Sequence, residues 1–159
     1  MQKILISGCL LGAKVRYNGE DKLIEHQLVN QWIKERRFVS VCPEMAGGLP
    51  TPRPPAEMIG RQVLTKHGVD VTVEFQRGAE IALRLCQQHG IKVALLKARS
   101  PSCGNEAVYD GTFSGRTIPG QGVTAALLIE NGIRVFNEDQ LLDAADFLAQ
   151  LESSLSTKK

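Results

Sequence analysis

Short apolar segments alternate with helical patterns along the 159-residue chain, and this alternation limits its fold more than any other feature. Four runs that lack strict polar–apolar alternation are predicted to be strands: residues 3–7, 38–42, 91–97 and 133–136. Runs of this kind suit parallel strands that are covered on both faces. The chain is therefore predicted to form a three-layer, Rossmann-like α/β domain with a mostly parallel sheet.

Helical periodicity fills the intervals between these runs. Apolar residues recur at helical spacing in four segments: 21–36, 72–89, 122–130 and 138–151. Gly90 follows the second segment, where a glycine commonly ends a helix. Residues 1–152 are thus expected to form one domain of common size, and residues 153–159 a polar, frayed tail.

Two segments rich in glycine and proline interrupt the pattern, at residues 43–69 and 99–122. Ordered loops of such length in a compact domain are usually functional. In open α/β sheets, ligands bind beyond the carboxyl ends of the strands. We therefore expect both segments to be long loops at that active edge, the second with a small hairpin near residues 108–113.

Charge and hydropathy limit the kinds of binding partner that we expect for this chain. The 19 basic and 17 acidic side chains leave a net charge of only +2, so no broad field is present for gripping a long nucleic acid. The longest apolar run, residues 125–129, is far shorter than the roughly 20 residues of a membrane span. The apolar residues ahead of Cys9 are too few for a signal peptide. We expect a cytoplasmic protein with a small-molecule partner, no membrane partner and a monomeric state.

Three of the four cysteines occupy equivalent places relative to the predicted strands. Cys9 follows the first strand, Cys42 ends the second, and Cys103 lies in the loop after the third. Because the carboxyl ends of parallel strands meet at one edge of a sheet, we expect these three thiols to converge. Cys86 lies on the apolar stripe of a predicted helix and is expected to be an unreactive core residue.

Converging thiols allow several chemistries. Soft thiolates suit an iron–sulfur cluster. A zinc ion that keeps an open position usually also binds histidine or carboxylate, and the three histidines fall on or beside predicted helices. Three buried, unreactive thiols are an equally good interpretation. These residues alone leave open a cluster enzyme, a zinc or thiol-dependent hydrolase, and a non-enzymatic nucleotide-binding module.

Six motifs follow one another in a distinctive order. They are GCLLGAKVRYNG at residues 8–19, VCPEMAGGLPTPRPPAE at 41–57, GVDVT and the following residues at 68–79, LLKARSPSCG at 95–104, YDGTFSG at 109–115, and PGQGVTAALL at 119–128. Together they resemble the thiouracil desulfidase (TudS-like) family, formerly domain of unknown function 523, in its stand-alone single-domain form. The resemblance extends over nearly the whole chain.

This resemblance implies a [4Fe-4S] cluster held by Cys9, Cys42 and Cys103, with one iron left open for substrate. It also implies catalytic roles for Glu44, in the Cys-Pro-Glu motif, and for Ser100, which opens Ser-Pro-Ser-Cys-Gly. The implied reaction removes sulfur from 2-thiouracil, 4-thiouracil or thiouridine monophosphate. Its products are the oxo base and hydrosulfide, and it needs no net redox change.

Each of these two catalytic candidates has a plainer alternative. Glu44 could pair with Arg53 or Arg16 as an ordinary loop carboxylate. Ser100 could cap the turn that precedes Pro101.

The predicted loops supply further candidates. Basic residues that could hold a substrate phosphate, or remain solvated charges, are Arg16, Arg53, Lys97, Arg99 and Arg116. Tyr17 and Tyr109 could stack on a pyrimidine or simply pack, and Ser102 and Glu57 are weaker site candidates. The amides of residues 120–122, ahead of a predicted helix, could bind an anion.

Overall fold

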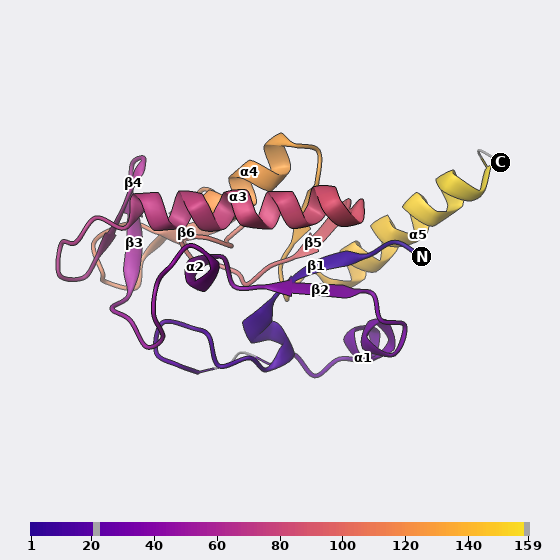
Figure 1. Ribbon diagram of the computed structural model, residues 1–159, viewed down its shortest axis with the longest axis horizontal. Helices are drawn as coiled ribbons and strands as arrows, with labels where there is room; N and C mark the ends of the chain where they lie inside the picture. Colours follow the sequence, from indigo (N-terminus) through magenta and orange to yellow (C-terminus); the bar gives the residue numbers. More distant parts are fainter. Residues whose placement is uncertain (21–22, 158–159) are drawn as a thin grey trace.

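The computed structural model describes residues 1–20 and 23–157 (Figure 1). Its central sheet has the order β2–β1–β5–β8. The four strands are β1 (Ile4–Ser7), β2 (Phe38–Val41), β5 (Val93–Leu95) and β8 (Arg134–Phe136). All three neighbouring pairs are parallel, which confirms the predicted sheet. The direction of winding reverses between β1 and β5, so the carboxyl ends of these strands form the topological switch point.

Helices cover both faces of the sheet and complete the three layers. They are α1 (Gln27–Lys34) and α5 (Leu141–Thr157) on one face, and α3 (Thr72–His89) and α4 (Val123–Glu130) on the other. Ile4 and Ile6 pack under the first pair, whereas Leu5 packs under the second. Each fully buried aliphatic side chain contributes about 1.5–3 kcal/mol to folding. No helix in the described part of the chain is both long and apolar enough to cross a bilayer.

The ends of α1 and α5 differ most from the sequence prediction. Residues 21 and 22 of the predicted helix 21–36 lie outside the described residues, and α1 begins only at Gln27, because the His26 side chain accepts a hydrogen bond from the Leu28 amide. At the other end of the chain, α5 continues to Thr157, although a frayed tail was predicted from residue 153. Just ahead of this extension, Glu152 on α5 forms an ion pair of 2.7 Å with Arg37.

The two long loops contain more structure than predicted. Residues 43–69 include α2 (Pro43–Ala46) and an antiparallel hairpin of β3 (Ala56–Ile59) and β4 (Gln62–Thr65). The second loop contains a hairpin of β6 (Ala107–Tyr109) and β7 (Thr117–Pro119). The predicted hairpin at 108–113 was therefore too short: its first strand agrees with β6, but its second strand, β7, begins only at Thr117. The Glu57 carboxylate accepts hydrogen bonds from the amides of Gly111 and Phe113 and holds these residues in the connecting turn. Figure 1 shows β3, β4 and β6 beyond the carboxyl ends of β1 and β2.

Candidate active site

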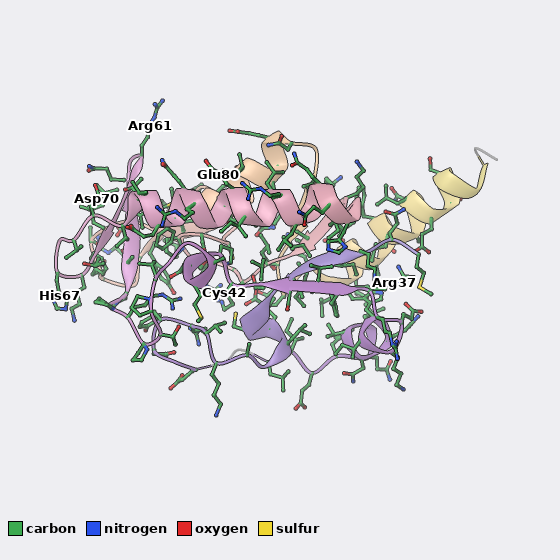
Figure 2. The ribbon with its side chains drawn as sticks, in the orientation of Figure 1. Arg37, Cys42, Arg61, His67, Asp70 and Glu80 are labelled. Carbon is green, nitrogen blue, oxygen red and sulfur yellow. The ribbon has the colours of Figure 1, made fainter. Side chains whose placement is uncertain are left out.

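A cavity of about 400 Å³ lies at the carboxyl edge of the sheet. All the predicted site residues line it: Cys9, Arg16, Tyr17, Cys42, Glu44, Arg53, Arg99, Ser100, Ser102 and Cys103. Cys86 is not among the lining residues and is buried on α3 in the apolar core, as predicted. Figure 2 shows Cys42 in the middle of the molecule, whereas His67 lies at its periphery.

The three cavity thiols come from the ends of three adjacent strands. Cys9 lies in η1 (Gly8–Leu11), a single 3-10 turn that directly follows β1. Cys42 is the N-cap residue of α2 and follows β2, and its Sγ donates to the Val15 carbonyl at 3.7 Å. Cys103 follows β5, and its Sγ accepts hydrogen bonds from the hydroxyl of Ser7 at 3.4 Å. The expected convergence of three distant cysteines is thus observed.

Burial makes these thiols poor acids. It raises the pKa of Cys9 to about 12, with further contributions from the neighbouring charges of Cys103 and Cys42. Burial also raises the pKa of Cys103 to about 11, and it raises the pKa of Cys42. Three thiolates gathered in one buried space are costly unless a cation compensates them. The arrangement therefore fits a positively charged metal centre that is bound with release of protons.

The donor set fits an iron–sulfur cluster. Three soft sulfur donors line the cavity, and no histidine or fourth cysteine is found among the described lining residues. Within residues 1–20 and 23–157, no three His, Cys, Asp or Glu side chains are drawn together tightly enough to hold a single ion. A four-iron cluster is larger than a single metal ion, so the cysteines that bind it lie farther apart than the ligands of one ion. With three ligands from the chain, one iron would lack a protein ligand.

The Cys42 corner, which we define as Cys42 and α2, is fixed by close packing of two helices. A Cβ atom at Gly78 on α3 would lie 1.8 Å from the carbonyl oxygen of Pro43. A Cβ atom at Gly47, which follows α2, would lie 1.9 Å from the carbonyl oxygen of Glu74. Only glycine allows backbones to approach so closely. This contact fixes both Cys42 and Glu44, which α2 carries in its first turn.

The Cys103 corner, which we define as residues 100–106, is held by hydrogen bonds instead. The Ser100 hydroxyl accepts a bond of 2.7 Å from the Cys103 amide, so Ser100 caps this turn. The amide of Thr124, in the first turn of α4, donates to the Ser102 carbonyl. The amides of Gly120 and Gly122 also donate to carbonyl groups of this corner. These two amides are therefore not free to bind an anion, as residues 120–122 were predicted to do.

A network of side-chain amides holds the other side of the same corner. The Asn105 amide donates to the Val135 carbonyl at 3.0 Å and to Gln140 Oε1 at 2.8 Å. Asn137 in turn donates to Asn105 Oδ1 at 2.9 Å. Asn137 and Gln140 belong to the turn between β8 and α5. This turn thus braces the Cys103 corner, and no pattern in the sequence singled these residues out.

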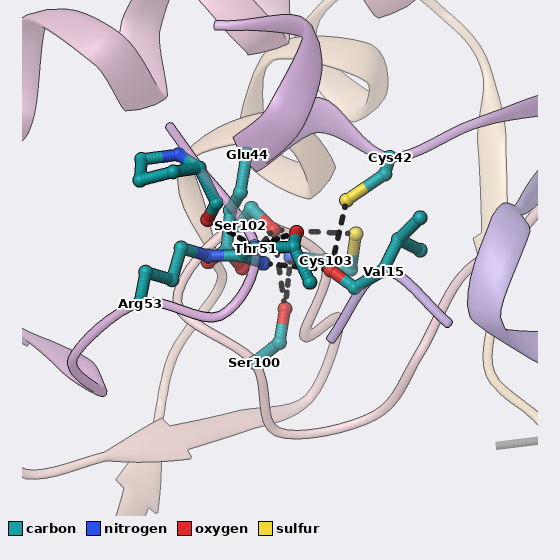
Figure 3. A network of polar contacts seen from close by, with 9 residues as sticks. Val15, Cys42, Glu44, Thr51, Arg53, Ser100, Ser102 and Cys103 are labelled. Atoms are coloured by element: carbon teal, nitrogen blue, oxygen red, sulfur yellow. Dashed lines mark hydrogen bonds and ion pairs between the residues drawn. The ribbon is translucent and has the colours of Figure 1, made fainter. Parts of the chain in front are cut away.

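A polar chain connects the carboxylate to the sulfur (Figure 3). Glu44 Oε1 pairs with Arg53 Nε at 3.0 Å, and Glu44 Oε2 accepts from the Ser102 hydroxyl at 3.2 Å. Ser102 Oγ also lies 3.3 Å from Ser100 Oγ and 3.4 Å from Cys103 Sγ. A hydroxyl has one proton, so Ser102 can donate to only one of these partners at a time. Ser102, a weak candidate from sequence, is central to the network.

The Arg53 guanidinium is hydrogen-bonded to other groups of the protein. Besides Glu44, it donates to the Val15 carbonyl at 3.0 Å and to Thr51 Oγ1 at 2.9 Å, and its side chain is only 5% exposed. The Val15 carbonyl also accepts from Cys42. Arg53 therefore ties the carboxylate to the Cys42 corner, which favours a positioning role over the predicted contact with substrate. The alternative of an ion pair between Glu44 and Arg53 is observed.

Three other cations line the cavity without a side-chain partner among the described residues: Arg16, Lys66 and Arg99. Lys97 also lines it but is paired with Glu138 at 3.0 Å. Arg116 is absent from the described lining, so the structure does not bring this candidate into the site. Lys66 was missed, because an exposed lysine in a turn-rich segment carries no signal. The aromatic lining consists of Tyr17, Tyr109 and Phe113.

Comparison with known proteins decides the family. The model of a family described as 2-thiouracil desulfurase matches residues 4–140. The chain belongs to this desulfurase family. The uncharacterized protein YbbK of Bacillus subtilis (strain 168) is 41% identical over 150 residues, which cover 88% of this chain and 98% of YbbK. A solved structure described as the [4Fe-4S]-dependent thiouracil desulfidase TudS matches with a TM-score of 0.93 and 52% identity. It covers 94% of this chain and 99% of that one.

Membership of the desulfurase family confirms the resemblance predicted from the motifs. The match begins at Ile4 in β1 and ends at Gln140, so it includes all three cavity cysteines and the turn that braces Cys103. Glu57 and Ser100 both lie in the cavity wall, where Glu57 accepts bonds from the amides of Gly111 and Phe113 and Ser100 accepts a bond from the Cys103 amide.

Proposed function

We propose that this chain is an iron–sulfur-dependent desulfidase that converts thiolated pyrimidines and water into the oxo base and hydrosulfide. One observation carries the proposal: thiols from three adjacent strand ends converge on a cavity whose wall also holds a carboxylate bonded to Ser102 and, through Ser102, linked to Ser100. The family match and the likeness to TudS support the same activity.

Cys9, Cys42 and Cys103 would hold the [4Fe-4S] cluster. When bound, this cluster supplies an iron without a protein ligand, which can act as a Lewis acid toward the sulfur of a thiocarbonyl. The chain itself supplies the remaining chemistry, which consists of orientation and proton transfer.

Glu44 is placed to move the protons. Its Oε1 is fixed by Arg53, which leaves Oε2, on the side of Ser102, to accept a proton from the water that adds to the thiocarbonyl carbon. The carbon–oxygen bond forms and the carbon–sulfur bond breaks. The sulfur leaves as hydrosulfide with the proton that Glu44 received, and the second proton of the water is released to solvent as the oxo base forms. Ser102 can pass a proton between Glu44 and Ser100, because its hydroxyl is within hydrogen-bond distance of both. Water supplies the oxygen and no electrons are gained or lost.

The free cations favour a phosphorylated substrate. Five basic and two acidic side chains line the cavity, and Arg16, Lys66 and Arg99 have no side-chain partner in the described part of the chain. Such donors suit a phosphate group. The aromatic wall of Tyr17 and Tyr109 would stack on the pyrimidine. We infer that a thiouridine monophosphate binds more tightly than the free thiolated base.

Anaerobic reconstitution with a turnover panel tests the activity. We expect about four irons per chain and sulfide release from 2-thiouracil, 4-thiouracil and 4-thiouridine monophosphate. Replacing Cys9, Cys42 or Cys103 by serine should abolish iron binding, whereas Glu44→Gln should keep the iron and stop sulfide release. A colourless, zinc-containing protein would favour a hydrolase. A cluster protein that releases no sulfide from any substrate would favour a binding module.

The phosphate preference has its own test. Lys66→Ala and Arg99→Ala should each raise KM for the monophosphate about tenfold, because one charge-assisted contact is lost, and should leave KM for the free base unchanged. Arg116→Ala, which removes a cation from outside the described lining, is the matched control. An equal rise in KM for base and monophosphate would contradict a phosphate contact.

A further inference from the structure

The turn that joins β6 to β7, residues 110–116, supplies a part of the cavity wall that the proposed mechanism does not use. Phe113 and Gly115 of this turn are among the lining residues. Phe113 is half-buried, whereas its neighbours Thr112 and Ser114 are exposed to solvent. The turn therefore directs its one aromatic side chain toward the cavity and its small polar side chains toward water.

The backbone of Phe113 has a conformation that bulky residues rarely adopt. Its φ angle is 56°, in the left-handed region that glycine and asparagine favour. Arg99, which lines the same cavity, has a φ angle of 66°. Such conformations persist only where the surrounding structure fixes them, and they are concentrated at active sites and ligand clamps. Contacts from outside the turn must therefore hold Phe113 in this shape.

Glu57 of β3 provides this restraint. Its Oε1 accepts hydrogen bonds from the amides of Gly111 at 2.9 Å and Phe113 at 3.2 Å, and the residue is only 7% exposed. Gly111 also lies close against β3, since a Cβ atom there would be 2.6 Å from Ile59 Cγ1 and 3.0 Å from the Met58 carbonyl oxygen. Hydrogen bonds to a carboxylate are roughly twice as strong as neutral ones. Phe113 is thus fixed relative to β3 as well as by its own hairpin.

The place and the chemistry of Phe113 limit what it can bind. Figure 1 shows β3, β4 and β6 beyond the carboxyl ends of β1 and β2, so this wall lies on the outer side of the site. A phenyl ring has no hydrogen-bonding group, so it can neither hold a phosphate nor move a proton. It can pack against an apolar or aromatic surface. In a thiolated pyrimidine nucleotide, that surface is the face of the pyrimidine ring.

We propose that Phe113 contacts the face of the pyrimidine ring and that Glu57 positions Phe113 for this contact. The inference rests on the proposed function and deepens it, because it assigns recognition of the ring to the β6–β7 turn, in addition to the two tyrosines named above. Lys66 and Arg99 are proposed to contact the phosphate instead. A free thiolated base and its monophosphate share the ring but not the phosphate, so kinetics can separate the two contacts.

Phe113→Asn tests the ring contact. Asparagine removes the ring and tolerates the left-handed backbone, so the turn keeps its shape. KM should rise about tenfold, the size of one lost stacking contact, and by the same factor for base and monophosphate. The value of kcat should not change, because the contact is made in the ground state and the transition state alike. An unchanged KM, or a rise for the monophosphate alone, would overturn the ring contact.

Ile118→Ala is the matched control for this substitution. Ile118 lies on β7 of the same hairpin, is 47% exposed and is not among the described lining residues. The alanine variant should keep the KM of the wild type for both substrates. If it raises KM as much as Phe113→Asn does, the hairpin acts on the site as a whole, and the specific role of Phe113 is overturned.

The positioning role of Glu57 is tested in combination with Phe113. Glu57→Ala leaves two amides without their acceptor and should raise KM as Phe113→Asn does, and the double variant should be no worse than either single variant. Glu57→Gln keeps a side-chain oxygen for both amides and should restore the KM of the wild type. Multiplying effects in the double variant, or a glutamine variant as poor as the alanine variant, would overturn this role. Should Glu57→Ala fail to fold, the shorter Glu57→Asp takes its place in the same comparison.

Calorimetry with uridine monophosphate separates the inference from the proposed function, with iron content measured on the same reconstituted samples. Phe113→Asn should weaken binding of this nucleotide by the factor seen in KM. A wild type that binds it in a Phe113-dependent way but releases no sulfide from thiolated pyrimidines overturns the activity and supports the ring contact. An active wild type whose Phe113→Asn variant binds as tightly overturns the inference alone. A wild type that neither binds the nucleotide nor releases sulfide overturns both.

Discussion

The Cys42 corner and the Cys103 corner lie in one cavity but are held by different forces. At the Cys42 corner, α2 and α3 meet backbone to backbone at Gly47 and Gly78, with no room for a Cβ atom. At the Cys103 corner, carbonyl and amide groups are matched by partners from α4 and from the β8–α5 turn. One thiol is thus positioned by shape and the other by hydrogen bonds.

This difference predicts how each corner fails. A close contact between two backbones cannot be weakened gradually, because any side chain added at the glycine forces the helices apart. A hydrogen-bond network can lose one member and keep the rest, at the cost of the unsatisfied group. Substitutions at the Cys42 corner should therefore act on fold and site together, and substitutions at the Cys103 corner should loosen the site in a fold that persists.

Gly78→Ala is expected to have the largest effect. The new Cβ atom would lie 1.8 Å from the Pro43 carbonyl oxygen, so α2 must move and must carry Cys42 and Glu44 with it. We expect a loss of about 3 kcal/mol or more in the free energy of unfolding, at the upper end of overpacking costs. Iron content and sulfide release should fall in parallel. Chemical denaturation and iron analysis measure the two effects.

Gly120→Ala is the control for that substitution. Its Cβ atom would meet only the Val108 side chain, at 3.4 Å, which is ordinary contact. We expect stability and iron content close to those of the wild type. If the two alanine variants behave alike, the close approach of α2 and α3 does not position the Cys42 corner.

The sequence predicted what depends on local pattern. The strand ends were placed within one or two residues, and with them the positions of Cys9, Cys42 and Cys103, because apolar runs are local and parallel strands align their ends. The Gly78–Pro43 contact was not predicted, since spacing along the chain does not reveal which backbones approach each other in space. The pairing of Asn105 with Gln140 was missed for the same reason: it depends on β5 and β8 being neighbours.

Asn105→Ala should have an intermediate effect. It removes two donated bonds and the acceptor of Asn137, which costs about 1–3 kcal/mol for the groups left unsatisfied. The chain should still fold and bind iron, but the cluster should be lost faster to a chelator because the Cys103 corner is less restrained. Iron release followed over time, beside Asn30→Ala on the exposed face of α1, distinguishes this result. Unchanged release would show that the amide network is not needed to hold Cys103.

Alkaline pH should destabilise the metal-free chain in part through the Cys103 thiol. The pKa of Cys103 is raised from 9.0 to about 11 in the folded state, so its stabilising effect is complete below pH 9 and is lost as the pH rises toward 11. Cys103→Ser should therefore reduce the loss of stability between pH 9 and 11, relative to the wild type. Urea denaturation at several pH values measures it. An equal alkaline loss in both proteins would contradict the raised pKa.

Cys86→Ser should have the smallest effect on the site, because Cys86 belongs to neither corner. Burial raises its pKa to about 11, as it does for Cys103, so acidity does not distinguish the two thiols. The two thiols differ in their surroundings: Cys86 packs in the apolar core on α3, whereas Cys103 lines the cavity. The new hydroxyl should cost about 1 kcal/mol of stability in that core, with iron content unchanged. Iron loss equal to that of Cys103→Ser would mean that burial alone, rather than convergence at the sheet edge, governs which thiols matter for the cluster.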